Sequence, residues 1–97
     1  MIKLKVQSAI NEQIKKEEYS SRLYLAMAIW CEATGYPGAS KFLYEHADEE
    51  RMHMLKLVKY INERGGHAKI SQLKAPSSSF GSFKEMFEKS EKQFISI

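Results

Sequence analysis

Apolar residues recur at steps of three and four positions along two long stretches, the spacing that lines one face of an α-helix. The first series is Val6, Ile10, Ile14, Ser21, Tyr24, Ala28 and Cys31. The second includes Phe42, Leu43, Leu57, Tyr60 and Ile61. Pro and Gly interrupt neither stretch, and they cluster in Gly35–Gly38 and at Gly65-Gly66. We therefore expect two long helices, over about residues 4–34 and 39–64, joined by a short turn.

A shorter third segment follows a connector over residues 65–81, which contains Pro76 and a run of serines and lacks helical periodicity. Ser82 and Glu85 form a capping box that predicts a short helix over residues 82–97. Its apolar face is expected to comprise Phe83, Met86, Phe87, Phe94 and Ile97. The pattern predicts an all-α chain, a long antiparallel helical hairpin with a short third helix, in a single domain of 97 residues.

Charged residues stand on the apolar stripes of both long helices. Glu17 lies on the first stripe, and His46, Glu50 and His53 lie on the second. Glu50 and His53 form a Glu-x-x-His pair one helical turn apart. Buried ionised carboxylates are costly unless they are paired or bound to a metal, so Glu17, Glu50 and His53 are candidate metal ligands. Glu-x-x-His also arises by chance in charged helices, and the alternative for His53 is a partly exposed, hydrogen-bonded side chain.

Three neighbouring side chains are candidates for supporting roles. Tyr24 lies two turns after Glu17, where it could hydrogen-bond a metal-bound oxygen or supply an electron, or simply pack in the core. Glu49 points about 100° away from Glu50, which suits either an accessory metal ligand or a solvated helix face. His46 lies one turn before Glu50, where it could orient a ligand, but we favour a helix-surface or packing role for it.

Composition narrows the remaining possibilities. The chain has 15 Lys and Arg against 12 Asp and Glu, a net charge of +3. The positive residues are spread over both long helices, which does not favour nucleic-acid binding. The longest apolar run, Leu23–Cys31, is too short to span a membrane, and residues 1–6 lack the apolar region expected of a signal peptide. The single Cys31 cannot form an internal disulfide. We expect a soluble, cytoplasmic protein.

The predicted helices point to self-association. Each would be about 40 to 45 Å long, and one hairpin partner covers only one side of each. Carboxylate-bridged di-metal bundles use a Glu from each of two helices and Glu-x-x-His from each of the other two. This sequence encodes half of that set. Two chains packed about a two-fold axis would supply four carboxylates and two imidazoles, so we expect at least a homodimer.

Several segments resemble the first two helices and the following crossover of bacterial non-heme ferritins. They are Asn11–Ser21, Leu23–Leu25, Trp30-Cys31, His46–His53, Asn62–Gly66 and Ala75-Pro76. The resemblance implies a ferritin-like fold in which Glu17, Glu50 and His53 hold iron in a ferroxidase centre, with Glu50 bridging two irons. It also implies that Tyr24 lies beside that centre and that Glu49 helps bind a third iron.

The sequence also departs from the ferritin pattern. The family's third helix supplies another metal-ligating Glu, which Glu91 would match only with a shift in register. Ligands of the family's fourth helix have no counterpart in this sequence. We therefore expect a half-ferritin that oxidises Fe(II) with dioxygen, for iron storage or detoxification, at a di-iron site holding two irons per pair of chains. The alternatives are a non-catalytic truncated ferritin serving as a structural or metal-binding hairpin, and a basic module that binds nucleic acid.

Overall fold

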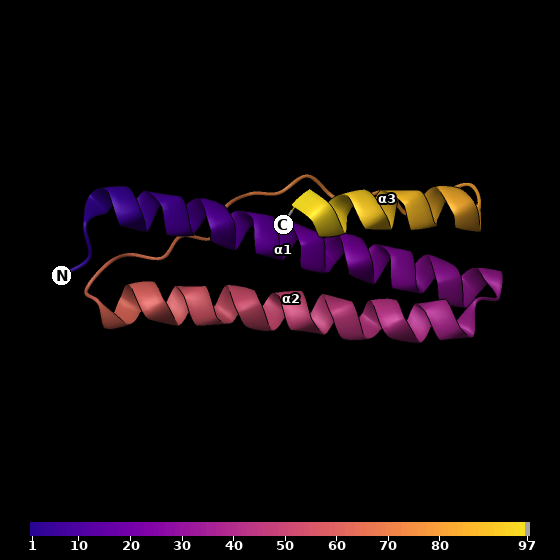
Figure 1. Ribbon diagram of the computed structural model, residues 1–97, viewed down its shortest axis with the longest axis horizontal. Coiled ribbons are helices and arrows are strands. Elements are labelled where there is room, and N and C mark those ends of the chain that lie inside the picture. The colour runs from indigo at the N-terminus through magenta and orange to yellow at the C-terminus, as the bar shows by residue number, and fades with distance from the viewer. Residues whose placement is uncertain (97) are drawn as a thin grey trace.

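A computed structural model describes residues 1–96 and contains three helices, α1 (Leu4–Thr34), α2 (Pro37–Glu63) and α3 (Phe83–Ser96), with no strand among those residues (Figure 1). The predicted all-α fold class, with two long helices and a short third one, is confirmed. Helix α2 begins two residues before the predicted start. Pro37 fits its first turn because the N–H that Pro lacks has no partner there. Ile97, predicted as the last residue of α3, lies outside the described residues.

Helices α1 and α2 run antiparallel along a molecule that measures 49 × 21 × 18 Å (Figure 1). The turn between them starts at Gly35, whose φ of 92° lies in the left-handed region that favours glycine. The next residue, Tyr36, donates its backbone N–H to the carbonyl of Cys31 at 2.8 Å. Two serine hydroxyls then bond the helices together: Ser40 Oγ donates to the Ala28 carbonyl, and Ser21 Oγ to the Ala47 carbonyl. The hairpin register is fixed by these bonds as well as by apolar packing.

The core consists of two apolar clusters separated by charged residues. The larger one contains Leu23, Tyr24, Met27, Ala28, Cys31, Leu43, Ala47, Phe80 and Met86. The smaller one contains Ile14, Met54 and Ile61. On both helices a buried carboxylate falls between the two clusters: Glu17 on α1 and Glu50 on α2. The middle of the hairpin is therefore polar inside, and the two helices face each other there through acidic side chains.

The connector and α3 lie along α1 (Figure 1). Asn11 holds the connector: its amide donates to the His67 carbonyl at 3.1 Å and accepts from the Lys69 N–H at 2.9 Å. Half of the predicted capping box is seen at the start of α3: the Glu85 N–H donates to Ser82 Oγ, whereas the Ser82 N–H donates to the Phe80 carbonyl. Of the apolar face predicted for this helix, Met86 is buried and Phe83 is partly buried.

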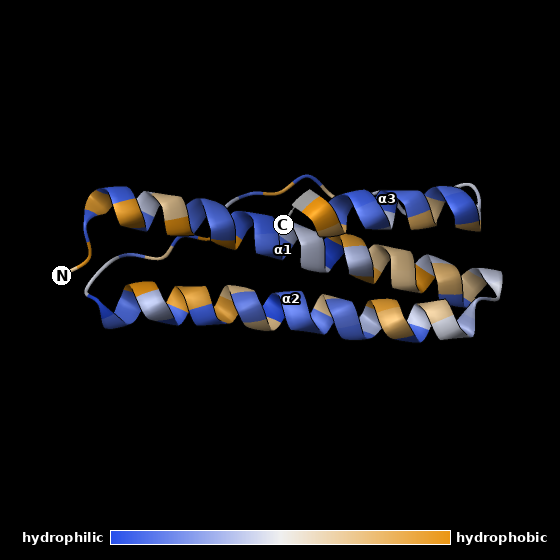
Figure 2. Cartoon of the chain, viewed as in Figure 1, coloured by the Kyte–Doolittle hydropathy of each residue, from blue (hydrophilic) through white to orange (hydrophobic). Residues whose placement is uncertain are grey.

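Phe87 and Phe94, which are predicted on the same apolar face of α3, are exposed. A short helix that packs on one side of a hairpin covers only part of its own circumference, which leaves these rings outside. Large apolar side chains are also exposed on the long helices, including Leu25, Ile29, Met52 and Leu55. Figure 2 shows apolar positions recurring along both long helices. Within the described part of the chain, no helix is long and apolar enough to cross a membrane.

Candidate metal centre

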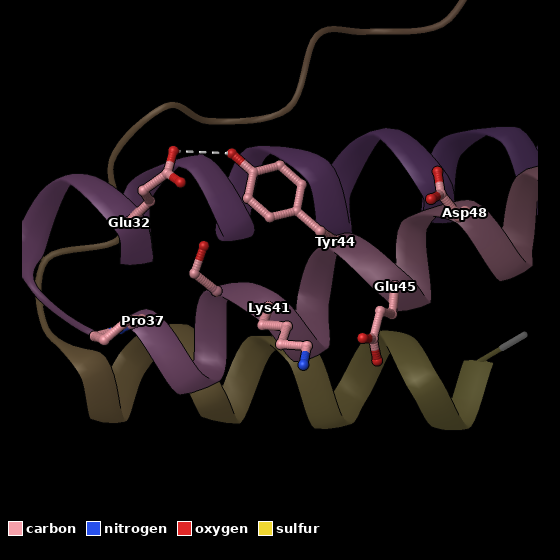
Figure 3. A pocket seen from close by; sticks show the side chains of 7 residues that line it. Glu32, Pro37, Lys41, Tyr44, Glu45 and Asp48 are labelled. Carbon is pink, nitrogen blue, oxygen red and sulfur yellow. Dashed lines mark hydrogen bonds between the residues drawn. The ribbon is translucent and has the colours of Figure 1, made fainter.

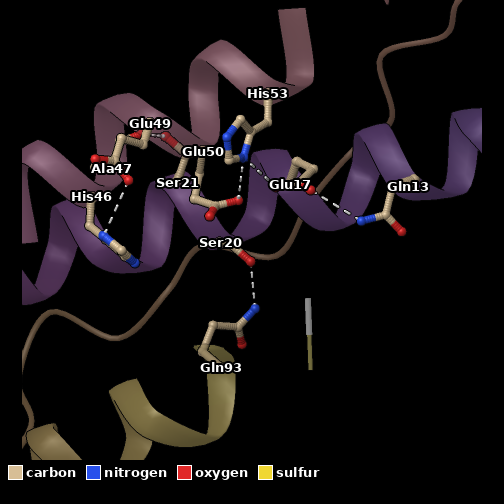
Figure 4. Close-up of polar contacts among 10 residues, drawn as sticks. All are labelled: Gln13, Glu17, Ser20, Ser21, His46, Ala47, Glu49, Glu50, His53 and Gln93. Atoms are coloured by element: carbon tan, nitrogen blue, oxygen red, sulfur yellow. Dashed lines mark hydrogen bonds and ion pairs between the residues drawn. The ribbon is translucent and has the colours of Figure 1, made fainter. Parts of the chain in front are cut away.

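Glu17, Glu50 and His53 meet between α1 and α2 (Figure 4). One ligand atom from each residue lies within 4.8 Å of the others. His53 Nδ1 is 3.8 Å from Glu17 Oε2 and 3.8 Å from Glu50 Oε2. The sequence spacing places Glu50 and His53 on one face of α2, and the hairpin register brings Glu17 opposite them. Two carboxylates and one imidazole around a common point form a donor set suited to a transition metal.

The carboxylates of this cluster lack the partners that burial demands. Glu17 is 7% exposed and Glu50 is 6% exposed. The Oε2 atoms of both are buried and have no hydrogen-bond partner, whereas Glu17 Oε1 accepts from Gln13 Nε2 at 3.2 Å. Leaving buried acceptors unpaired is unfavourable, and a cation between them would remove that cost. The side chain of His53 is 53% exposed, so the cluster has one open side.

The two carboxylates also perturb each other's protonation. Burial raises the pKa of Glu50 from 4.5 to about 8, with further contributions from the neighbouring carboxylate of Glu17 and from the charge of Glu49. The metal-free pair therefore retains a proton at neutral pH. A metal ion that binds there must displace this proton, so binding is coupled to proton release.

Tyr24 lies beside the carboxylate pair, as its position in the sequence predicts. Its side chain is fully buried and its hydroxyl has no partner. Burial, followed by the charges of Glu50 and Glu17, raises the pKa of Tyr24 to about 12. The phenol thus stays neutral and keeps a proton that it can donate to an oxygen atom at the centre.

His46 belongs to an aromatic cluster next to Tyr24. The rings of His46 and Tyr24 meet edge to face at 5.0 Å, and His46 stacks with Phe42 at 5.2 Å and with Phe94 of α3 at 4.9 Å. The predicted packing role of His46 agrees with these contacts. Its Nε2 atom is buried without a partner, while Nδ1 lies 3.6 Å from Glu49 Oε2.

The accessory candidates do not join the three ligands. The Glu49 side chain is 62% exposed and pairs with His46 instead. Glu91 is exposed on α3, where it lines a groove with Phe87 and Phe94. Two polar contacts were not anticipated. The bond from Gln13 to Glu17 spans four residues of α1, a spacing that could have revealed it. The 2.6 Å bond from Gln93 to Ser20 spans 73 residues and has no local signal.

A separate hollow of about 330 Å³ lies near the hairpin turn (Figure 3). The side chains around it are those of Glu32, Pro37, Ser40, Lys41, Tyr44, Glu45 and Asp48. The Tyr44 hydroxyl donates to Glu32 Oε1 at 3.2 Å across this hollow. Its acids are accessible to water and its buried hydroxyl, that of Ser40, is already bonded to a carbonyl. This hollow therefore lacks buried carboxylate oxygens without partners, such as those of Glu17 and Glu50.

Comparison with known proteins agrees with the fold. Residues 7–97 match the family model described as a ferritin-like domain. The chain is 41% identical to the bacterial non-heme ferritin of Campylobacter jejuni over 98% of this chain and 58% of the relative. It is 46% identical to a probable bacterial non-heme ferritin-like protein of Haemophilus influenzae, over 91% of this chain and 53% of the relative. The chain spans about half the length of these relatives, and it belongs to the ferritin-like domain family.

Proposed function

We propose that this chain binds Fe(II) through Glu17, Glu50 and His53, and that two chains together form a di-iron carboxylate centre that oxidises Fe(II) with dioxygen. The observation that carries the proposal is the pair of buried carboxylate oxygens without partners, 3.8 Å from an imidazole nitrogen. The names of the relatives, bacterial non-heme ferritins, support iron as the metal. The cellular role would be iron storage or detoxification, in the cytoplasm, where a free buried Cys31 is stable.

The donor set suits the proposed reaction. Anionic oxygen ligands stabilise Fe(III) more than Fe(II), which lowers the potential of the bound ion. An imidazole nitrogen favours a transition metal over Mg²⁺ or Ca²⁺. Two Fe(II) ions each give one electron to the same dioxygen molecule, which takes up two protons and leaves as hydrogen peroxide. The proton held by the Glu17 and Glu50 pair is released when iron binds, and Tyr24 keeps a hydroxyl proton beside the centre.

Pairing of two chains would complete the centre. A single chain offers two carboxylates and one imidazole, and a symmetric pair doubles that number. The His53 side of the cluster is the exposed one, so a second chain could approach there. Exposed apolar side chains on both long helices, such as Ile29 and Met52, provide surface that association would bury. We propose Glu49 only as an accessory ligand, because its exposed side chain can bind an iron ion that arrives from solvent.

Aerobic oxidation of Fe(II) by the purified chain, followed through the near-ultraviolet absorbance of ferric iron, tests this function. We expect Glu50→Gln to abolish protein-dependent oxidation, because it removes the proposed bridging carboxylate. Glu45→Gln is the matched control, since Glu45 is exposed on the same helix and lies away from the cluster. Equal rates for both variants and the unmodified chain would rule out oxidation at this centre.

A non-catalytic metal-binding hairpin is the second candidate. It is favoured by α3, which places Phe94, rather than a carboxylate, against His46 beside the centre. The same assay separates the two functions, because this candidate predicts iron binding without oxidation above the rate in buffer.

A further inference from the structure

Along the sequence the positive residues are spread over both long helices, but the fold gathers most of them at one end of the molecule. This end consists of residues 1–16 and residues 54–70, which meet at the open end of the hairpin (Figure 1). We call it the basic end. Its exposed basic residues are Lys3, Lys5, Lys15, Lys16, Lys56, Lys59, Arg64 and Lys69. These eight stand against two acids, Glu12 and Glu63, so the basic end has a net charge of +6 with histidine neutral.

Packing and hydrogen bonds fix the segments of the basic end to one another. The smaller apolar cluster of the core lies inside it. The Ile2 N–H donates to the Arg64 carbonyl at 3.0 Å, which joins the start of the chain to the end of α2. The His67 N–H donates to Gln7 Oε1 at 3.0 Å, which joins the connector to α1. The positive charges are therefore held on a folded surface rather than on a free tail.

The charge of the basic end is not compensated within the molecule. Among the residues that the structure describes, none of the eight basic side chains forms an ion pair. The charges from α1 alone lie within about 20 Å of helix, since each residue adds 1.5 Å. Like charges packed at this density repel one another and oppose compact folding. A negatively charged partner would relieve that repulsion.

A second copy of this chain offers too little negative charge to be that partner. Residues 17–50 and 75–96 together carry ten acids and five basic residues, but two of the acids, Glu17 and Glu50, are buried. The surface outside the basic end thus has a net charge of −3, half of what the basic end requires. A DNA duplex carries one negative charge for about every 1.7 Å of its axis, or about twelve over 20 Å.

We propose that the basic end binds the phosphate backbone of double-stranded DNA. The molecule is 21 × 18 Å in cross-section, so the hairpin is wider than the major groove of about 12 Å and lies against the backbone. All but one of the eight basic residues are lysines, and lysine contacts to phosphates carry no sequence information. Binding is therefore independent of sequence. It is also independent of the proposed metal centre, whose ligands lie outside the basic end.

Fluorescence anisotropy of a short labelled DNA duplex, with a chelator present, tests the proposal. The eight side chains come from several segments, so we expect about three to five of them to reach phosphates at once. The affinity should then fall about 60- to 500-fold between about 50 and 200 mM salt. A duplex of unrelated sequence should bind equally well. Glu50→Gln should bind DNA like the unmodified chain, so that the metal site and the DNA surface can fail separately.

Two triple variants locate the binding surface. Replacing Lys15, Lys16 and Lys59 with Gln should weaken binding at least about ten-fold and lower the salt dependence by about one contact for each phosphate lost. Replacing Lys41, Lys84 and Lys92 with Gln removes the same net charge from exposed positions outside the basic end. This control should change the affinity less than about two-fold.

Four outcomes would overturn the proposal. They are no binding at about 50 mM salt, equal weakening by the two triple variants, tighter binding of polyglutamate than of the duplex, and self-association of the chain that the basic-end variant alone abolishes. Sedimentation velocity without DNA measures the last of these. The exposed lysines should be replaceable without loss of helical circular dichroism. If the first triple variant does not fold, replacing Lys3, Lys5 and Lys56 with Gln provides the same test.

Discussion

Replacing Glu50 with Gln should stabilise the metal-free chain at high pH and leave it unchanged at low pH. Burial beside Glu17 raises the pKa of Glu50 to about 8 in the folded chain, against 4.5 for the ordinary group. The folded state therefore binds this proton more tightly than the unfolded state does. Below pH 4.5 both states are protonated and no penalty arises. Between pH 4.5 and pH 8 the folded chain loses stability progressively, because ionising Glu50 costs more there.

The size of the effect follows from the two pKa values. At about 1.4 kcal/mol for each pH unit, the penalty reaches about 4 kcal/mol at pH 8, as an upper limit because Glu50 and Glu17 titrate together. Gln keeps the shape and hydrogen bonding of protonated Glu but cannot ionise. The free energy of unfolding of a folded domain is usually about 5 to 15 kcal/mol. The penalty at Glu50 would therefore be a large part of it. The metal-free protein thus gives up stability to keep two acids in its core.

Urea unfolding followed by circular dichroism at pH 5 and pH 8, with a chelator present and at one protein concentration, measures this difference. We expect Glu50→Gln to raise the free energy of unfolding by several kcal/mol at pH 8 and by less than about 1 kcal/mol at pH 5. Glu45→Gln, at an exposed position, should change it by less than about 0.5 kcal/mol at either pH. An equal shift for Glu50→Gln at both pH values would refute the assignment of Glu50 as a buried acid with a raised pKa.

Three further predictions concern the surroundings of the centre. His53→Ala should weaken Co(II) binding at least about ten-fold, as measured by titration. The free energy of unfolding should not change, because the side chain is half exposed. An unchanged Co(II) affinity would mean that His53 is not a ligand. Tyr24→Phe removes a buried hydroxyl that has no hydrogen-bond partner. Urea unfolding should show that the metal-free variant is more stable by up to about 1 kcal/mol. A loss of stability would mean that the hydroxyl makes a hydrogen bond in the folded chain. Ser20→Ala removes the hydrogen bond from Gln93 and should speed amide hydrogen exchange in α3 but not in α2. If α3 exchanges at the same rate in the variant and in the unmodified chain, the bond does not hold this helix in place.

The metal cluster could be predicted because its residues interrupt the apolar stripes of two helices that follow each other directly in the sequence. Glu17 interrupts the apolar stripe of one helix, and Glu50 and His53 interrupt the stripe of the other at helical spacing. The glycine-rich turn at Gly35 then makes the two helices neighbours. Once the hairpin forms, geometry alone brings the three side chains together. Gln13 is also close in sequence to its partner, since it lies one turn before Glu17.

The surroundings on the α3 side could not be predicted in the same way. Phe94 and Gln93 reach His46 and Ser20 only because a connector without periodicity returns the chain along α1. Phe94 reads as one more apolar residue of an amphipathic helix, and its exposed position beside an imidazole depends on where that helix docks. Glu49 carries no signal that distinguishes a metal ligand from a surface acid, and it lies exposed against His46.

Native mass spectrometry of the purified chain, with and without Fe(II) under anaerobic conditions, tests whether iron binds at Glu17, Glu50 and His53, because one spectrum gives subunit and metal counts. We expect an even-numbered oligomer that gains one iron per chain, two for each pair, and a Glu50→Ala variant that gains none. A chain that binds no iron at any subunit count, or binds it equally well without the Glu50 carboxylate, would contradict a metal centre at Glu17, Glu50 and His53.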